Sequence, residues 1–308
     1  MTYDLLIIGG GPAGVAAGVY AARKQLKTLL ITSEWGGQSI VSAEIQNWIG
    51  TIAISGPELA QNLQSHLEAY KGEFVDILSE TKVTSVKKQG VNFIVTTDKG
   101  TTFEVANILV TVGSTRRKLL IPGADTFEHK GLTYCASCDG PMFSGSDIVV
   151  IGGGNAAFES ASQLLAYAKS VTILQRGPEF RADEITVKKV LEHPNVKAYT
   201  NTELVEIKGD TFVSSLVYTD VSANETHDLK VTGIFVEIGL IPSTDFIGEL
   251  VKKNTNGQII VDPRTQRTST VGVWAAGDCT DGLYHQNNIA VGDAVKALED
   301  IYLAIHAK

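Results

Sequence analysis

The pattern of apolar positions occurs twice along the chain. Residues 4–14 read DLLIIGGGPAG and residues 147–157 read DIVVIGGGNAA. In each copy an acidic residue precedes four apolar residues, a glycine-rich stretch follows, and an alanine-rich segment comes after it. An unbroken apolar run of this length predicts a strand buried on both faces of a parallel sheet, and the alanine-rich segment predicts a helix. We therefore expect the same strand, turn and helix unit twice.

Other stretches have different periods. Residues 72–105 alternate apolar and polar positions around the turn signals QG and DKG, which predicts a small antiparallel sheet. Residues 286–306 repeat apolar positions at helical spacing, which predicts a helix that closes the first domain.

Two further segments resemble each other and mark domain boundaries. Residues 107–123 and 233–246 each run from a strand into a glycine turn and a proline-containing connection. We interpret them as the points where the chain passes between domains. The expected fold class is α/β, with two Rossmann-like, three-layer ββα domains. The first comprises residues 1–116 and 245–308, and the second, residues 117–244, is inserted into it.

The glycine spacing predicts the chemistry of both turns. In the first turn, Gly9 permits the tight bend, Gly11 lets a pyrophosphate approach the backbone, and Gly14 lets the helix pack close to its strand. The amides of the helix N-terminus then bind the phosphates. The candidate residues that complete the two turns are Pro12 and Ala13 in the first, and Gly152, Gly154, Asn155, Ala156 and Ala157 in the second.

The strand after each turn distinguishes the two nucleotides. The first such strand ends in TLLITSE, so Glu34 lies where a carboxylate accepts hydrogen bonds from ribose hydroxyls. The second ends in VTILQR, which brings Gln175 and Arg176 to that place, with Arg181 nearby. Because a guanidinium binds phosphate bidentately, the two arginines favour a 2′-phosphate. We expect FAD at the first turn and NADPH at the second, with NADH possible.

Composition and charge exclude other classes of protein. The 308 residues carry a formal net charge of −8 without a run of basic residues, so neither nucleic acid nor a polybasic membrane surface is expected as a partner. Residues 5–22 are uncharged, but no basic segment precedes them and their glycines would break a spanning helix. We therefore expect a cytoplasmic protein without a signal peptide or membrane span. Three cysteines are an odd number, unlike a disulfide-stapled secreted domain.

Seven segments together carry a resemblance to a known family. They are GGGPAG with EWGGQ and IQNWIG downstream, CASCDGPMF, GGGNAAFES, EFRAD and WAAGDC. The chain resembles the low-molecular-weight thioredoxin reductase family over essentially its whole length. Within that family, CDGPMF, VEIKGD, GIFVEIGLIPSTDF and NGQIIVD are similar to the C-terminal flavoprotein portion of bacterial alkyl hydroperoxide reductase. The resemblance does not extend to the N-terminal thioredoxin-like region of that protein.

The resemblance implies a role for each matching position, and a homodimer. Gly9, Gly11, Gly14 and Glu34 would hold the ADP part of FAD; Gly37, Gln38 and Asn47 would line the flavin side; Gly277 and Asp278 would face the ribityl chain; and His285, Gln286, Asn287 and Ile289 would bring a helix N-terminus to the isoalloxazine. Cys138 would be the sulfur nearest the flavin, Cys135 the one that attacks the protein substrate, and Asp139 the acid and base for the thiol proton.

The residues themselves leave three interpretations of the cysteine pair. A zinc site needs two more ligands, and the chain offers only Cys279 and scattered histidines. An inert buried pair is the second interpretation. A redox-active pair is favoured because the two cysteines can close a small disulfide loop, a helix start would lower a thiolate pKa, and Asp139 supplies a proton carrier.

The expected function is transfer of electrons from NAD(P)H through FAD and the Cys135–Cys138 disulfide to a thioredoxin or glutaredoxin-like protein. The inserted domain is expected to rotate near residues 114–120 and 241–245.

One departure from the family keeps alternatives open. Thioredoxin reductases usually carry H-R-R before F-R-A, whereas this chain reads QRGPEFRA. The peroxidase-reducing relatives carry an acidic residue at the place of Gln175 and use NADH. The alternatives are an NADH-dependent reductase of a peroxiredoxin system, a ferredoxin-linked or oxygen-using dithiol oxidoreductase, and a non-enzymatic redox-sensing flavoprotein.

Overall fold

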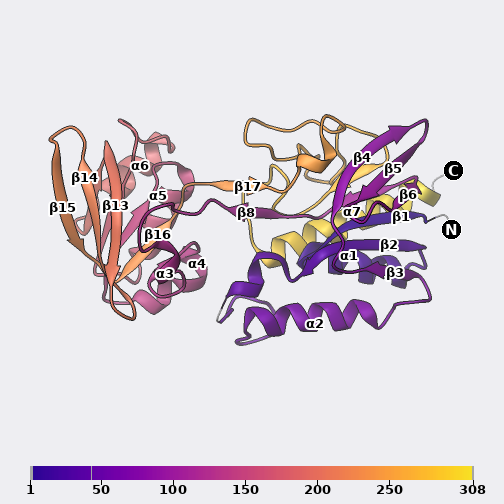
Figure 1. The fold of residues 1–308 in the computed structure, drawn as a ribbon, viewed down its shortest axis with the longest axis horizontal. Helices are drawn as coiled ribbons and strands as arrows, with labels where there is room; N and C mark the ends of the chain where they lie inside the picture. Colours follow the sequence, from indigo (N-terminus) through magenta and orange to yellow (C-terminus); the bar gives the residue numbers. More distant parts are fainter. Residues whose placement is uncertain (1–2, 43, 307–308) are drawn as a thin grey trace. The chain divides into compact units, whose positions relative to one another are not determined.

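The computed structural model describes residues 3–42 and 44–306 and divides the chain into two units. Unit 1 comprises residues 1–115 and 241–308, and unit 2 comprises residues 116–240. The sequence boundaries were expected after residues 116 and 244, whereas the second unit of the structure already ends at Leu240. Figure 1 shows unit 2 as an insertion between two segments of unit 1.

Unit 1 is built on a five-stranded sheet in which every neighbouring pair is parallel. Its strand order is β18-β7-β1-β2-β3. The strands are β1 (Leu5–Gly10), β2 (Thr28–Trp35), β3 (Val75–Leu78), β7 (Ile108–Val110) and β18 (Val273–Ala275). The helices of the unit are α1 (Pro12–Arg23), the 3₁₀ segment η1 (Gly37–Val41), α2 (Gly56–Glu68), η3 (Asp245–Ile247) and α7 (Asn287–His306). The predicted first strand and the predicted C-terminal helix are both confirmed.

Alternate residues of β1 face two different cores. Leu5 and Ile7 are fully buried against α1 and α7. Leu6 and Ile8 belong to a second cluster on the other face of the sheet. Since successive side chains of a strand point to opposite faces, an entirely apolar strand requires a layer on each side.

A three-stranded antiparallel sheet supplies that second layer. It consists of β4 (Val83–Gln89), β5 (Asn92–Thr97) and β6 (Thr102–Val105), and Phe93 of β5 is fully buried in the second core. The prediction of an antiparallel sheet over residues 72–105 was therefore right for residues 83–105 and wrong for β3, which pairs in parallel with β2. Period alone does not identify the partner of a short strand.

Unit 2 repeats the same architecture. Its parallel sheet has the order β12-β11-β10-β16-β9. The strands are β9 (Leu132–Thr133), β10 (Asp147–Ile151), β11 (Ser170–Leu174), β12 (Val196–Tyr199) and β16 (Gly233–Val236). The helices are α3 (Ala124–Phe127), α4 (Ala136–Asp139), the 3₁₀ segment η2 (Gly140–Phe143), α5 (Asn155–Leu164) and α6 (Glu184–Leu191). The second predicted strand and the helix after it are thus confirmed.

The layers of unit 2 also follow from alternation. Ile148 and Val150 of β10 pack with the buried face of α5, including Phe158. Val149 and Ile151 pack on the antiparallel sheet of β13 (Thr202–Gly209), β14 (Val213–Asp220) and β15 (Glu225–Lys230). Both units are three-layer ββα domains, as the fold-class prediction stated.

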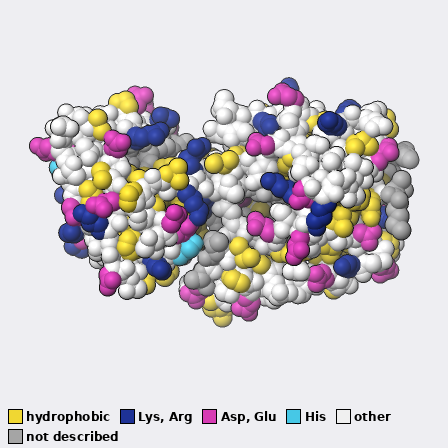
Figure 2. All heavy atoms as spheres, in the orientation of Figure 1, with side chains coloured by type: hydrophobic (Ala, Val, Ile, Leu, Met, Phe, Trp, Pro, Cys, Tyr) yellow, Lys and Arg dark blue, Asp and Glu magenta, His cyan; other side chains and the backbone are white. Residues whose placement is uncertain are grey.

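The two connecting segments pair with each other. They form the two-stranded sheet of β8 (Ser114–Arg116) and β17 (Leu240–Pro242). A glycine with a left-handed backbone precedes each strand, Gly113 at φ +64° and Gly239 at φ +101°. Figure 2 shows acidic and basic side chains interspersed over the drawn face, in keeping with the mixed charge of the sequence.

Candidate functional site

Unit 1 contains a cavity of about 360 Å³ at the carboxyl ends of its parallel strands. Its lining comes from the turn after β1, the end of β2, the start of η1, the segment after β7, and the loop after β18. Ligands of open parallel sheets bind at this edge, so the cavity lies where a dinucleotide is expected.

Glycine occupies each of the three positions of the first turn for a different structural reason. Gly9 has φ +119°, and a β-carbon there would overlap the backbone of Thr111. A β-carbon on Gly14 would overlap the carbonyl oxygen of Gly9, so this glycine lets α1 lie against its strand. Gly11 differs from both, because its nearest neighbour is the Cα of Gly37, 4.0 Å from an added β-carbon. The free space beside Gly11 opens into the cavity, where a ligand can approach the backbone.

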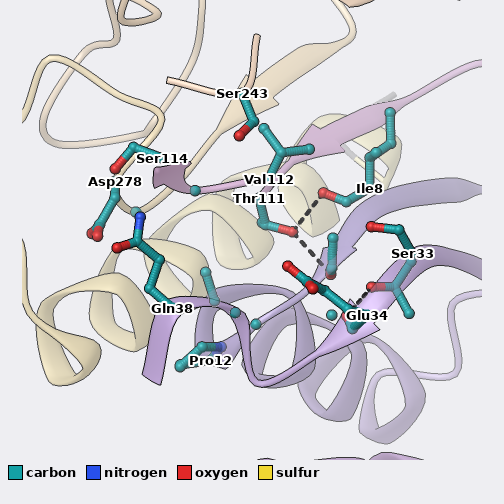
Figure 3. Close-up of a pocket in the computed structure, with 18 of the residues that line it drawn as sticks. Ile8, Pro12, Ser33, Glu34, Gln38, Thr111, Val112, Ser114, Ser243 and Asp278 are labelled. Carbon is teal, nitrogen blue, oxygen red and sulfur yellow. Dashed lines mark hydrogen bonds between the residues drawn. The ribbon is translucent and has the colours of Figure 1, made fainter. Parts of the chain in front are cut away.

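The start of α1 is free to bind an anion. Gly11 is its N-cap residue and supplies no side-chain cap, and Pro12 occupies the first turn. Figure 3 shows Glu34 and Asp278 on opposite sides of the cavity. The start of α1 suits a phosphate group, and a carboxylate lies on each side of the cavity. This arrangement fits an elongated nucleotide that has a hydroxyl-bearing sugar or polyol at each end.

Hydrogen bonds connect the start of α7 to the loop that follows η1. Asn47 donates its side-chain amide to Gln286 at 3.1 Å, and Asn288 donates to the backbone oxygen of Asn47 at 2.8 Å. Ser39 donates to Asn287 at 2.9 Å. These bonds hold one wall of the cavity, since Ser39 and Asn287 both line it.

In unit 2 the second glycine turn has the same design. Gly152 has φ +138°, and a β-carbon there would overlap the carbonyl oxygen of Glu237. Gly154 is the N-cap residue of α5, has no side-chain cap, and leaves open space where a β-carbon would stand. Ala157 is fully buried under the turn. Each turn therefore joins a sterically obligatory first glycine to a central glycine beside open space.

The segment after β11 folds back onto this turn. Arg181 donates its backbone N–H to the carbonyl of Gly153 at 2.6 Å, and Asp183 donates its N–H to Asn155 at 2.8 Å. Gln175 donates its amide to the carbonyl of Glu179 at 3.2 Å. Arg176 and Arg181 are both exposed. Gln175 and the arginines thus come from a segment whose backbone is fixed against the glycine turn.

A partly buried carboxyl lies directly after β16. Glu237 accepts a hydrogen bond from the hydroxyl of Ser160 on α5 at 2.8 Å. Burial raises the pKa of Glu237 above its ordinary value, which the Ser160 hydrogen bond and the charge of Arg116 partly offset.

Cys135 and Cys138 form a disulfide in the structure, with their Cα atoms 5.3 Å apart. Cys135 is the N-cap residue of the one-turn helix α4, and the backbone N–H of Cys138 donates to its sulfur at 3.2 Å. Both cysteines are partly buried, and Ala136 between them is packed into the core beside α5. The core contact of Ala136 fixes the backbone of the pair, whereas the side chains of both cysteines are not fully enclosed.

Asp139 follows directly and has a defined partner. The buried hydroxyl of Thr133 on β9 donates to its carboxylate. The backbone N–H of Asp139 also donates to the carbonyl of Cys135 at 3.1 Å. An acid is therefore held one residue from the disulfide.

Cys279 is separate from this pair. It is fully buried in unit 1, its thiol lies 3.6 Å from the carbonyl oxygen of Val110, and burial raises its pKa to about 12. Within residues 3–42 and 44–306, no group of three or more His, Cys, Asp and Glu residues is arranged to hold a metal ion. The same ranges include no helix that is long and apolar enough to cross a membrane.

The cavity brings together most of the residues that the sequence assigned to FAD. Those that line it are Gly9, Gly11, Pro12, Ala13, Glu34, Gly37, Gln38, Gly277, Asp278 and Asn287. Gly14 lies beneath the turn, Asn47 and Gln286 bond to each other beside the wall, and Ile289 is partly exposed. The ring Nε2 of His285 is buried and has no hydrogen-bond partner in the described part of the chain.

Sequence reasoning missed a third wall of the cavity. Thr111, Val112, Gly113, Ser114 and Thr115 line it after β7, and Ser243 and Phe246 line it after β17. The available signal was the TVGST stretch after an apolar strand, which we interpreted only as a domain connection.

Comparison with known proteins gives consistent results. A family model described as pyridine nucleotide-disulphide oxidoreductase matches residues 3–294. The structure is similar to thioredoxin reductase from Streptococcus pyogenes, with a TM-score of 0.89 and 32% identity over 100% of this chain and 99% of that chain. It is also similar to thioredoxin reductase from Giardia duodenalis, with a TM-score of 0.91 and 33% identity over 98% and 99% of the two chains.

Among curated proteins, one component of alkyl hydroperoxide reductase from Escherichia coli is 38% identical over 296 residues. The match covers 96% of this chain and 57% of that protein. The chain thus spans little more than half the length of the curated relatives it matches.

Proposed function

Because the chain belongs to the pyridine nucleotide-disulphide oxidoreductase family, which implies FAD and a pyridine nucleotide, we propose that it is a disulfide reductase. Electrons would pass from NAD(P)H through FAD and the Cys135–Cys138 disulfide to a disulfide of a thioredoxin-like protein. The observation that carries the proposal is the formed Cys135–Cys138 disulfide, with Asp139 beside it, in a chain that also contains two dinucleotide turns.

The residues of unit 1 fit FAD. The open space beside Gly11 and the uncapped start of α1 would receive the pyrophosphate, Glu34 would accept from the adenosine ribose, and Asp278 would face the ribityl chain. Gly37, Gln38 and the Asn47–Gln286 pair would border the isoalloxazine, and the start of α7 would offer its amides there. When bound, FAD supplies a two-electron relay between the nicotinamide and the disulfide.

The residues of unit 2 carry the thiol chemistry. Two electrons and a proton cleave the S–S bond into one thiol and one thiolate. The N–H of Cys138 directed at the sulfur of Cys135 stabilises a thiolate there, which supports Cys135 as the nucleophile toward the partner. Its attack forms a mixed disulfide and releases a partner thiolate, and Cys138 then resolves the mixed disulfide. Asp139, held by Thr133, is the group that takes and returns the thiol proton.

Unit 2 is proposed to move relative to unit 1 during turnover, because nicotinamide and disulfide cannot occupy the same flavin face together. Two observations support a hinge at the predicted segments. The chain crosses between the units only at residues 115–116 and 240–241 of the described structure, and a left-handed glycine precedes each crossing strand. A homodimer is the expected assembly, and light scattering on the purified protein would measure it.

The proposed nucleotide is NADPH. Arg176 and Arg181 are exposed on the segment that folds over the second turn, and both offer a guanidinium to a 2′-phosphate. A second candidate is an NADH-dependent reductase in a peroxiredoxin system. The observation that favours it is that the Escherichia coli relative is a component of alkyl hydroperoxide reductase.

The experiment is an anaerobic titration of the flavin-loaded protein with NADPH and with NADH, followed by flavin absorbance. We expect NADPH to bleach the flavin at lower concentration. Arg181→Ala should weaken NADPH by about tenfold, the value of one charge-assisted hydrogen bond, and leave NADH unchanged. Tighter binding of NADH by the unaltered protein would instead support the second candidate.

The cysteines are tested in the same preparation. Cys138→Ser should still be bleached by the nucleotide but should reduce no thioredoxin-like disulfide. If neither nucleotide bleaches the unaltered protein, the proposed function is wrong.

A further inference from the structure

The hydroxyl of Ser114 is buried without a partner. Ser114 is the first residue of β8 and is 4% exposed. Its Oγ has no hydrogen-bond partner among the described residues. Because a buried hydroxyl that makes no hydrogen bond destabilises the protein that contains it, such an atom in a native fold calls for an explanation.

Ser114 lines the cavity of unit 1, and Figure 3 shows it beside Asp278, on the other side of the cavity from Glu34. Thr111, on the same wall, provides a contrast. Its hydroxyl donates to the carbonyl of Ile8 at 2.9 Å, inside the protein. The next hydroxyl along the chain, that of Thr115, donates to the carbonyl of Ile241 at 3.3 Å. Of these three hydroxyls on one wall, that of Ser114 alone has no partner within the described protein.

We propose that Ser114 is a ligand of FAD, with its hydroxyl bonded to a polar atom of the polyol or pyrophosphate part of the cofactor. The inference rests on the proposed FAD site and adds a contact from the segment that connects the two units. The same residue opens β8, so the contact joins the cofactor directly to the first crossing strand.

The proposal predicts that Ser114→Ala has opposite effects on the stability of the apoprotein and on the affinity for FAD. In the apoprotein, Ser114→Ala removes an unsatisfied polar atom and should raise the thermal stability of unit 1. With FAD present, the same change removes a hydrogen bond and should lower the affinity for the cofactor by about five- to tenfold. A serine that only supports the fold would lower apoprotein stability, and its effect on FAD would follow from that loss.

The test compares the apoproteins of the unaltered chain, Ser114→Ala and Ser215→Ala. Ser215 is a matched control, since it is a serine 1% exposed on β14 of unit 2. Affinity is measured by the quenching of FAD fluorescence on binding, and stability by thermal unfolding without FAD. We expect weaker FAD binding only for Ser114→Ala, together with an equal or higher unfolding temperature of its apoprotein.

Three outcomes would overturn the inference. Unchanged FAD affinity in Ser114→Ala would mean that the hydroxyl does not contact the cofactor. A lower apoprotein unfolding temperature would mean that the hydroxyl has a partner within the protein. If the unaltered apoprotein does not bind FAD, both the inference and the proposed function fail, whereas the first two outcomes leave the proposed function intact.

Discussion

At the scale of single residues, Glu237 shows how tertiary packing changes the chemistry of a side chain. Its carboxyl lies between the end of β16 and Ser160 of α5, near the charges of Arg116 and Glu159. Burial is the largest cause of its raised pKa. The folded protein therefore binds a proton at Glu237 more tightly than the unfolded chain does.

The sign of the pH dependence follows from this difference. The favourable contribution of Glu237 is complete below its unfolded pKa of about 4.5, and it is lost as the pH rises through the higher folded pKa. We expect Glu237→Gln to stabilise the protein near neutral pH and to flatten this decline. Thermal unfolding of both proteins between about pH 4 and pH 8 measures the effect. Glu159→Gln, at an exposed neighbouring carboxylate, is the control, and an equal flattening in that variant would contradict the prediction.

Cys279 illustrates a residue that packing makes inert. Because burial raises the pKa of its thiol to about 12, almost none of it is thiolate at neutral pH. After reduction of the native protein, we expect iodoacetamide to label Cys135 and Cys138 but not Cys279, as read by mass spectrometry of peptides. Labelling of Cys279 at the rate of the other two would show that its surroundings open readily.

At the scale of elements, the first and the central glycine have different roles in both turns. Gly9 and Gly152 adopt positive φ and would clash with backbone if they carried a side chain. Gly11 and Gly154 have extended backbones with negative φ and open space beside them. The fold itself therefore requires the first glycine of each turn, whereas only a ligand requires the central one.

This distinction predicts that alanine at the central glycine of each turn weakens the binding of one cofactor and not of the other. Gly11→Ala should lower FAD affinity by about 10- to 100-fold, the loss of one or two hydrogen bonds to phosphate, and leave nucleotide binding unchanged. Gly154→Ala should weaken NAD(P)H to a similar extent and leave FAD in place. Cofactor retention on gel filtration and isothermal titration with a non-reducing nucleotide read the two effects. Neither variant should lower the unfolding temperature of the apoprotein, and a large loss would show that the central glycines serve the fold.

At the scale of the whole molecule, the insertion of unit 2 concentrates any relative motion in two strands. Gly239 precedes β17, has φ +101°, and has no atom within 4 Å of an added β-carbon. The β-carbon of an alanine there would touch no other residue. The substitution therefore tests only the cost of a positive φ at this position.

We expect Gly239→Ala to slow the reduction of a protein disulfide by about fivefold, since alanine in a left-handed conformation costs about 1 kcal/mol. FAD content and nucleotide affinity should not change. Gly100→Ala is the matched control, because Gly100 also has positive φ, at +76°, and open space, but lies in a hairpin of unit 1. Equal slowing in both variants would contradict a hinge at Gly239, and stopped-flow kinetics of each half-reaction would separate the steps.

The sequence by itself determined the repeated framework, because apolar runs and steric limits on glycine are local. The buried strands β1 and β10, the turns with Gly9 and Gly152, the helix α7 and the layered α/β class all follow from patterns within about 20 residues. The spacing from the first turn also located Glu34 in the cavity, whereas Asp278 was located there by the family resemblance.

Only the tertiary structure decided which distant groups meet. The parallel pairing of β3 with β2, the bond of Asn288 to Asn47, and the partial burial of Glu237 depend on contacts between remote segments. Ser114 is the clearest case. Its sequence context shows a connection between domains, whereas its unpartnered hydroxyl in the cavity wall becomes visible only once β7, β18 and the first turn are brought to the same edge of one sheet.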